Sequence, residues 1–255
     1  MYKNKKIIGI IPARYSSTRL PAKPLANILG KSLLQWVYDG CITSTLLDKV
    51  IVATDDERIG NLCSKNNIEF IMTSPDILTG SDRILSAYKL LNQDFDYIIN
   101  IQGDEPLIKG DTLDALIINT IESTAPVGTL INEIEDENDL NNPNIVKVVI
   151  NNKYNALYFS RQAIPFIREV SKENWFKNHT YFKHIGIYIF KTNILEIFCS
   201  YEQTTLEKLE KLEQLRLLEN DIDIYCYKTN DFFYSIDTPE DLIYINNYIG
   251  SKGNE

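Results

Sequence analysis

The sequence predicts an α/β fold, in which a largely parallel sheet is sandwiched by helices and a strand-rich insertion occupies the middle of the chain. In the first half, short apolar runs alternate with amphipathic segments of helical period. This alternation is typical of βαβ units, whose strands lie parallel and whose helices cover both faces of the sheet. After about Thr124 the rhythm changes, because strand-like runs follow one another with little helix between them.

Size and composition limit the possible classes of protein. The 255 residues suit one α/β domain, so we expect a single domain over residues 1–255 with a strand-rich subregion at about 125–190. The net charge of −9 argues against nucleic acid as a partner. No run approaches the roughly 18 apolar residues that would span a membrane. The four cysteines lie far apart without metal-ligand spacing, so we expect reduced thiols and a cytoplasmic protein.

The elements of the first half are predicted from the spacing of their apolar residues. Over residues 32–45, Leu33, Val37 and Cys41 recur at helical spacing and give one apolar face. Strands are expected where short apolar runs stand between polar residues. These criteria predict strands over residues 7–11, 49–54, 69–72 and 96–101, and helices over residues 32–45, 57–67, 81–91 and 112–121.

The second half is predicted to contain more strands. Leucine recurs roughly every three residues from Leu206 to Leu218 among many charges, which favours one solvated amphipathic helix. Thr238-Pro239-Glu240-Asp241 begins the last helix, because proline suits a first helical turn and acids favour a helix N-terminus. We expect strands over residues 127–131, 145–150, 156–160, 181–190 and 222–227, an irregular stretch over 162–180, and helices over 192–200, 206–220 and 238–249.

A basic loop follows the first strand. It carries Arg14, Arg19 and Lys23, with hydroxyl groups in the Ser16-Ser17-Thr18 stretch between the arginines. Ligands of open α/β sheets bind outside the carboxyl ends of the strands, so these cations indicate a polyanion such as a nucleoside triphosphate. Glycine-rich phosphate-binding motifs are absent, so side-chain cations would hold the phosphates. A strand followed by a basic loop is also common without any such ligand.

Two aspartates stand next to predicted elements, and the first of them, Asp104, is a candidate magnesium ligand. Asp104 follows the strand at 96–101 within Gln102-Gly103-Asp104-Glu105-Pro106, and Asp237 immediately precedes the last helix. Mg²⁺ takes oxygen ligands and uses one or two protein carboxylates together with phosphate oxygens. Asp104 also fits a turn, and the local sequence of Asp237 favours a helix N-cap.

The stretch Pro12-Ala13-Arg14-Tyr15-Ser16-Ser17-Thr18-Arg19-Leu20-Pro21-Ala22-Lys23-Pro24-Leu25 resembles the opening motif of the 3-deoxy-manno-octulosonate (Kdo) cytidylyltransferases. Further matches, in the family's order, reach to about residue 242. The related sialic acid enzymes typically have Lys-Asn where this chain has Lys23-Pro24. The resemblance implies a Rossmann-related fold like that of nucleotide-diphospho-sugar transferases, with CTP, Mg²⁺ and an acidic sugar as ligands. It also implies a homodimer and transfer of CMP to Kdo for lipopolysaccharide synthesis.

The resemblance also implies roles for individual residues. Asp104 and Asp237 would hold the metal and, with Arg14 and Lys23, form the catalytic set. The nucleotide contacts would be Pro12, Ala13, Arg14, Lys23, Ser81, Arg83 and Gln102. The sugar contacts would be Gln102, Arg161, His184, Tyr188, Glu213 and Gln214. For Arg161, the planar guanidinium is suited to binding a carboxylate. A lone histidine such as His184 is, without the resemblance, more often structural than catalytic.

Two features leave alternatives open. Ile77-Leu78 stands where many family members have a polar pair, and the motif Thr79-Gly80-Ser81-Asp82-Arg83 exchanges the family's serine and threonine. The same reaction on the 8-amino analogue of Kdo or on a sialic acid is therefore an alternative. A non-catalytic nucleotide-binding relative is another, although both carboxylates and both cations are present.

Overall fold

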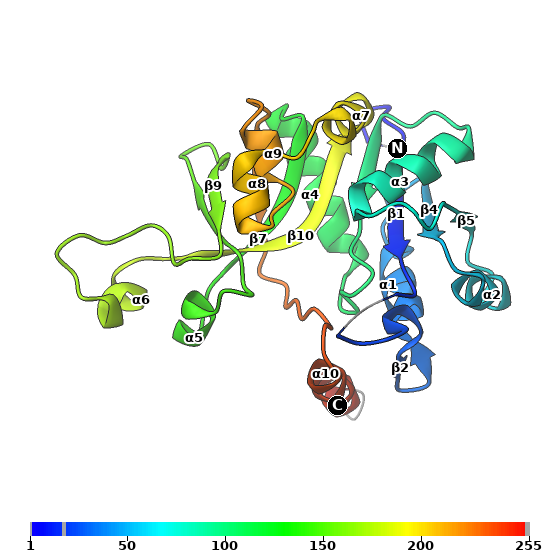
Figure 1. Cartoon of the computed structure of the whole chain (residues 1–255), viewed down its shortest axis with the longest axis horizontal. Coiled ribbons are helices and arrows are strands. Elements are labelled where there is room, and N and C mark those ends of the chain that lie inside the picture. The colour runs from blue at the N-terminus through cyan, green and yellow to red at the C-terminus, as the bar shows by residue number, and fades with distance from the viewer. Residues whose placement is uncertain (1, 17–18, 253–255) are drawn as a thin grey trace. The chain divides into compact units, whose positions relative to one another are not determined.

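The computed structural model describes residues 2–16 and 19–252 (Figure 1), and the chain divides into two compact units. The first unit contains the described residues up to Ala115 and those from Phe232 onward. The second unit is Leu116–Asp231. The boundary between them falls within helix α4 (Gly110–Ser123). The expected single domain is not decided by this division and stays a prediction.

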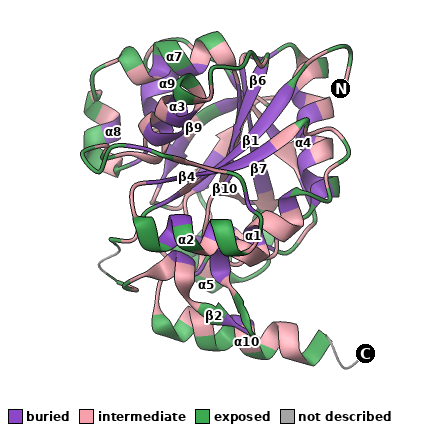
Figure 2. Ribbon diagram, turned by 90° about the vertical axis from the view of Figure 1, so that its right-hand side faces the viewer, coloured by how far each residue is buried: buried purple, intermediate pink, exposed green. Residues whose placement is uncertain are grey.

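The first unit is built on four parallel strands. Strand β1 (Ile7–Ala13) lies between β4 (Lys49–Thr54) and β6 (Tyr97–Asn100), and β5 (Phe70–Met72) pairs with the far side of β4. Every residue of β1 except Pro12 is buried, as expected for a strand covered on both faces (Figure 2). Because β1 and β6 are parallel neighbours, the loops that follow them leave the sheet at the same edge.

Helices α1 (Leu33–Cys41), α2 (Glu57–Lys65) and α3 (Gly80–Leu91) pack on these strands, with α1 and α3 on β1 and α2 and α3 on β4. Each begins at a polar N-cap whose side chain accepts a backbone N–H: Ser32, Asp56 and Thr79. The last helix, α10 (Pro239–Lys252), also belongs to this unit. The sequence did not predict the 3₁₀ turn η1 (Lys23–Leu25) or the hairpin of β2 (Asn27–Ile28) and β3 (Lys31–Ser32).

The second unit has a mixed sheet. Strand β7 (Val127–Glu133) is antiparallel to β10 (Phe182–Lys191) and parallel to β11 (Ile224–Lys228). Strand β8 (Lys147–Ile150) pairs antiparallel with β10 and with β9 (Ala156–Ser160). Up to residue 200, the helices that lie wholly in this unit are α5 (Glu137–Asn141), η2 (Lys172–Asn174), α6 (Trp175–Asn178) and α7 (Thr192–Ser200).

The predicted fold class is confirmed, but the single helix predicted over residues 206–220 is wrong. The segment forms two helices, α8 (Thr205–Glu210) and α9 (Leu215–Leu218), because Lys211 takes a left-handed conformation with φ 56° and ends α8. The break lets Arg216 form a bidentate ion pair with Glu207, at 2.5 and 2.7 Å. In one continuous helix, residues nine apart would lie on opposite faces and about 14 Å apart along the axis.

The same segment is not the solvated helix that its charges suggested. Glu207, Gln214 and Arg216 are all buried.

The four cysteines are free thiols, and three of them are buried. Within the part of the chain that is described, no helix combines the length and the apolar character needed to cross a membrane.

We predict that removal of one partner of the buried Glu207–Arg216 pair strongly destabilises the second unit. Glu207→Ala leaves a buried guanidinium without its carboxylate and should lower the free energy of unfolding by about 3–5 kcal/mol. The control is Glu133→Ala, which removes the exposed Lys228–Glu133 pair and should cost no more than about 1 kcal/mol. Denaturant unfolding measures both, and equal losses would contradict the prediction.

Candidate active site

Three separate stretches of the first unit meet at Lys23. Its Nζ donates to Asp104 Oδ2 at 2.6 Å and to Asp237 Oδ1 at 3.0 Å. Arg19 Nη2 lies 3.1 Å from the other oxygen of Asp237. The side chain of Lys23 is only 18% exposed, whereas that of Arg19 is 61% exposed. The structure therefore brings the two predicted metal ligands together around a predicted phosphate-binding cation.

The backbone fixes these side chains in place. Ile101 N donates to Ile10 O, so the loop carrying Asp104 begins beside the end of β1. A Cβ atom on Gly103 would lie 3.0 Å from the Pro12 carbonyl oxygen, so a larger residue would crowd β1 at this turn. Lys23 opens the turn η1, which is entered through Ala22 in the left-handed region, with φ 57°. Both cation and carboxylate are thus held at the carboxyl edge of the sheet.

Glu105 and Ser235 join the two aspartate-bearing segments. Ile236 N donates to the Asp104 carbonyl oxygen at 3.0 Å, and the Ser235 hydroxyl is hydrogen-bonded to the Glu105 carboxyl group. Glu105 is buried and its Oε2 has no hydrogen-bond partner among the described residues. Burial, with the nearby charge of Asp104, raises the pKa of Glu105 to about 8. Neither Glu105 nor Ser235 was predicted as part of the site, although Glu105 stands next to Asp104 in the same motif.

Asp237 does not cap helix α10. The Asp241 carboxylate accepts the backbone N–H of Thr238 at 2.8 Å, and the Thr238 hydroxyl accepts that of Asp241 at 3.2 Å. This reciprocal pair is a capping box, with Thr238 as the N-cap. The N-cap alternative for Asp237 is therefore wrong, because the cap belongs to the next residue along. The carboxylate of Asp237 is left to face Lys23 and Arg19.

The donor set suits a single hard cation. Burial alone would lower the pKa of Lys23, but the charges and hydrogen bonds of Asp104 and Asp237 outweigh burial and raise it. Within residues 2–16 and 19–252, no group of three or more histidine, cysteine, aspartate or glutamate side chains could hold a metal. Two carboxylates around one cation fit an ion such as Mg²⁺, which takes its other ligands from phosphate and water.

The remaining predicted nucleotide contacts have different environments. Arg14 is exposed, and its Nη1 donates to the Leu78 carbonyl oxygen at 2.5 Å. Arg83 is fully buried and its guanidinium donates to Asp55 at 2.7 Å, with further bonds to Thr73 and to the Ile77 carbonyl oxygen. Ile77 and Leu78 thus contribute backbone carbonyls, which any residue supplies.

The other nucleotide candidates differ in burial. Ser81 is buried, whereas Gln102 and Pro12 are partly buried and Ala13 is buried at the end of β1. Ser17 and Thr18 of the basic loop lie outside the described residues.

The predicted sugar contacts lie in the second unit, apart from Gln102. The Nε of Arg161 donates to the Glu210 carbonyl oxygen at 2.8 Å, and its Nη1 donates to that of Pro143 at 3.0 Å. Glu210, in turn, accepts the Ser160 hydroxyl and the Arg161 backbone N–H. Arg161 therefore anchors the end of β9 to the end of α8, a role that its sequence context did not reveal.

His184 and Tyr188 lie on β10 with their rings 5.2 Å apart. His184 Nε2 lies 3.0 Å from the Thr129 hydroxyl, and burial lowers the pKa of the imidazole to about 3. The hydroxyl oxygen of Tyr188 and the Nε2 of Gln214 are buried and have no hydrogen-bond partner among the described residues. Glu213 contributes a negative charge near Tyr188. These two unpartnered groups have hydrogen-bonding capacity that a polar ligand would satisfy.

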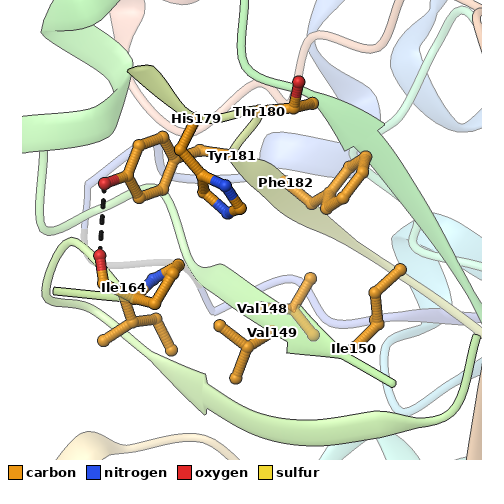
Figure 3. Close-up of a pocket in the computed structure, with 9 residues that line it drawn as sticks. Val148, Val149, Ile150, Ile164, His179, Thr180, Tyr181 and Phe182 are labelled. Carbon is orange, nitrogen blue, oxygen red and sulfur yellow. Dashed lines mark hydrogen bonds between the residues drawn. The ribbon is translucent and has the colours of Figure 1, made fainter. Parts of the chain in front are cut away.

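A separate pocket of about 290 Å³ lies in the second unit (Figure 3). It is lined mainly by apolar side chains of β8 and of the segment around the start of β10. The Tyr181 hydroxyl donates to the Pro165 carbonyl oxygen at 3.1 Å beside it. None of the predicted site residues lines this pocket, so it does not correspond to the predicted sugar site.

Comparison with known proteins defines first the class and then the family. A cytidylyltransferase family profile matches residues 8–224, which is most of the chain. The 3-deoxy-manno-octulosonate cytidylyltransferase of Cytophaga hutchinsonii is 44% identical over 244 residues, covering 95% of this chain and 97% of that protein. Its counterpart from Thermodesulfovibrio yellowstonii is 46% identical over 241 residues, covering 92% and 94%.

A solved structure gives the same result. The CMP:2-keto-3-deoxy-manno-octonic acid synthetase complexed with CTP superposes with a TM-score of 0.89 at 34% identity, covering 97% of this chain and 99% of that one. The chain therefore belongs to the cytidylyltransferases, and among them to the 3-deoxy-manno-octulosonate cytidylyltransferase family. The family resemblance of the sequence motifs is confirmed.

We predict that mutations distinguish the cap of helix α10, formed by Thr238 and Asp241, from the ion pairs of Asp237. Asp241→Ala removes the carboxylate of the capping box and should lower the free energy of unfolding by at least about 1 kcal/mol. Asp237→Asn leaves the box intact and serves as the control. Unfolding is measured in the absence of divalent metal, and a larger loss for Asp237→Asn than for Asp241→Ala would contradict the assignment of the cap.

We predict that His184 makes the protein sensitive to acid. Its pKa is about 3 in the folded chain and about 6.5 when unfolded, so the unfolded chain binds the proton more tightly. The stability that neutral His184 contributes is complete above pH 6.5 and is lost as the pH falls towards 3. Between pH 7.5 and pH 5, the free energy of unfolding of the wild type should therefore change by about 2 kcal/mol less favourably than that of His184→Gln, because groups such as Glu105, whose pKa is raised to about 8, contribute equally to both proteins.

The control for this measurement is His179→Gln, which replaces the only other histidine, an exposed one. Free energies of unfolding at pH 7.5 and pH 5 are compared for the three proteins. His179→Gln should follow the wild type, and a wild-type pH dependence retained by His184→Gln would refute the prediction.

Proposed function

We propose that this protein transfers CMP from CTP to the anomeric hydroxyl of Kdo, giving CMP-Kdo and diphosphate for lipopolysaccharide synthesis. The observation that carries the proposal is the cluster of Lys23, Asp104 and Asp237 at the carboxyl edge of a parallel sheet. It occurs in a chain 44% identical, over nearly its whole length, to an enzyme named for cytidylyl transfer to this sugar.

In the proposed reaction, the sugar oxygen forms a bond to the α-phosphorus while the bond to the bridging oxygen of the diphosphate breaks. The sugar hydroxyl loses its proton, and the diphosphate leaves with the electron pair. Arg14 and Lys23 would hold the phosphates and neutralise the charge that develops on the leaving group. Pro12, Ala13, Ser81, Arg83 and Gln102 complete the proposed nucleotide site. No covalent enzyme intermediate is required, so catalysis consists of positioning and electrostatic stabilisation.

The proposed metal is Mg²⁺, held by Asp104 and Asp237. When bound, it would neutralise charge on the α-phosphate and lower the pKa of the attacking hydroxyl. Support comes from the distances to one shared ammonium group, 2.6 and 3.0 Å, which put both carboxylates within reach of a single cation. The connection of Asp104 to Ile236 and of Glu105 to Ser235 supports a fixed separation between the two ligands.

The proposed sugar site of the second unit uses Arg161, His184, Tyr188, Glu213 and Gln214. It is supported by the buried, unpartnered Tyr188 hydroxyl and Gln214 amide, which a polyhydroxylated sugar would pair. Neutral His184 can donate or accept a hydrogen bond without charge. We further propose a cytoplasmic homodimer, because four free thiols suit a reducing compartment and the resemblance implies a dimer.

We predict that diphosphate release from CTP requires both Kdo and Mg²⁺. Asp104→Asn and Asp237→Asn should each lower turnover by about a hundredfold or more, equivalent to about 3 kcal/mol of barrier. The double variant should lose much less than the sum, because both side chains act through one ion. Asp39→Asn, which changes an exposed carboxylate paired with Lys31, is the control and should stay near the wild type.

The assay measures turnover against Mg²⁺ concentration with a panel of sugars: Kdo, its 8-amino analogue and a sialic acid. Turnover with Kdo well above the others would support the proposed substrate. Diphosphate release without sugar, or near-normal Mg²⁺ dependence in Asp237→Asn, would contradict the proposed mechanism. CTP binding without product from any sugar would instead indicate a non-catalytic relative.

A further inference from the structure

The proposed metal ligands already have cations beside them. The carboxylates of Asp104 and Asp237 face the ammonium group of Lys23, and Asp237 also faces Arg19. The charges of the two carboxylates are therefore balanced by those of Lys23 and Arg19. A free divalent ion that entered while Lys23 remained would find the carboxylate charge already neutralised and would be repelled by the ammonium group.

The ammonium group of Lys23 can leave while its backbone stays. The turn is fixed by hydrogen bonds from Leu25 N to Ala22 O and from Ala26 N to Lys23 O, and Pro24 is buried. The lysine side chain is a compact charge on a flexible four-carbon stem. Rotation of this stem moves the ammonium group off the carboxylates without any change in the sheet or its loops.

A nucleoside triphosphate supplies the new partner. It carries more negative charge than one divalent ion neutralises, so it can bind the metal and the displaced ammonium group together. A free metal ion offers Lys23 no such partner and leaves its charge to be solvated at a partly buried position, where the side chain is only 18% exposed. Entry of the metal is therefore coupled to entry of the triphosphate.

We propose that Lys23 blocks the carboxylate pair of the free enzyme, so that this site takes a complex of divalent metal with a nucleoside triphosphate and not the free metal ion. This inference rests on the proposed function, because it takes Asp104 and Asp237 as the metal ligands. It assigns Lys23 a part in the order of binding, in addition to phosphate contact.

The experiment measures Mn²⁺ binding by electron paramagnetic resonance, in which the free ion is observed directly. Three proteins are compared without nucleotide: the wild type, Lys23→Met, and Lys31→Met as the control. Lys31 pairs with Asp39 on the surface and belongs to neither proposed binding site. If the carboxylate pair is open in about one molecule in ten or fewer, Lys23→Met should bind Mn²⁺ at least about tenfold more tightly than the wild type.

A CTP analogue that cannot be cleaved between its α- and β-phosphates then tests the coupling. It should tighten Mn²⁺ binding to the wild type and to Lys31→Met, and much less so to Lys23→Met. Adding Asp237→Asn to Lys23→Met should abolish the tight Mn²⁺ binding, which locates the ion at this pair. Equal Mn²⁺ affinities of the wild type and Lys23→Met without nucleotide would overturn the proposal.

Thermal unfolding gives a second readout that does not depend on turnover. Lys23→Met leaves two carboxylates without their shared cation and should unfold at a lower temperature, and Mn²⁺ should raise its Tm more than that of the wild type. An equal rise in both proteins would count against the proposal. The Mn²⁺-binding and unfolding experiments contain no sugar. A failure of CMP transfer in the turnover assay would therefore leave their results unchanged, so the proposed function and the proposed role of Lys23 can fail separately.

Discussion

The ion pairs of Lys23 with Asp104 and Asp237 constrain the architecture of the first unit. Two carboxylates close together repel each other, and the cation between them converts this repulsion into attraction. The arrangement requires the loop after β1, the loop after β6 and the segment before α10 to meet at one point. Parallel pairing of β1 with β6 brings the first two loops to the same edge, and the bonds of Ile236 and Ser235 hold the third segment there.

The sequence predicts well those features that depend on local pattern. The parallel strands follow from apolar runs such as that of β4, whose predicted bounds agree with the structure. The chain also places Asp104 after its strand as predicted. The break at Lys211 was not predictable, because leucine spacing continues through it. It is stabilised by the pairing of Glu207 with Arg216, a tertiary contact that residue spacing does not encode.

The capping of α10 shows a second limit. Thr238-Pro239-Glu240-Asp241 correctly indicates a helix start, but both Asp237 and Thr238 are acceptable N-caps by residue type. What decides between them is the side chain of Asp241, which folds back to the N–H groups before it. Local sequence could have favoured Thr238, since a carboxylate three residues later is part of the capping-box pattern. The position of Lys23 beside Asp237 could not have been inferred locally, because the two are far apart in the chain.

Buried and partly buried cations in this protein have two kinds of partner, and the sequence does not distinguish them. Arg161 donates to backbone carbonyls and holds loops together. Lys23 donates to the carboxylates of Asp104 and Asp237, and its side chain is 18% exposed. Carbonyl partners are neutral, so an incoming anion can be attracted without first breaking an ion pair. Carboxylate partners need a second cation to neutralise their charge before the first cation can leave them and bind an anion. A ligand for Lys23 therefore has to provide both charges, a cation for the aspartates and an anion for the lysine, and a metal-bound triphosphate does so.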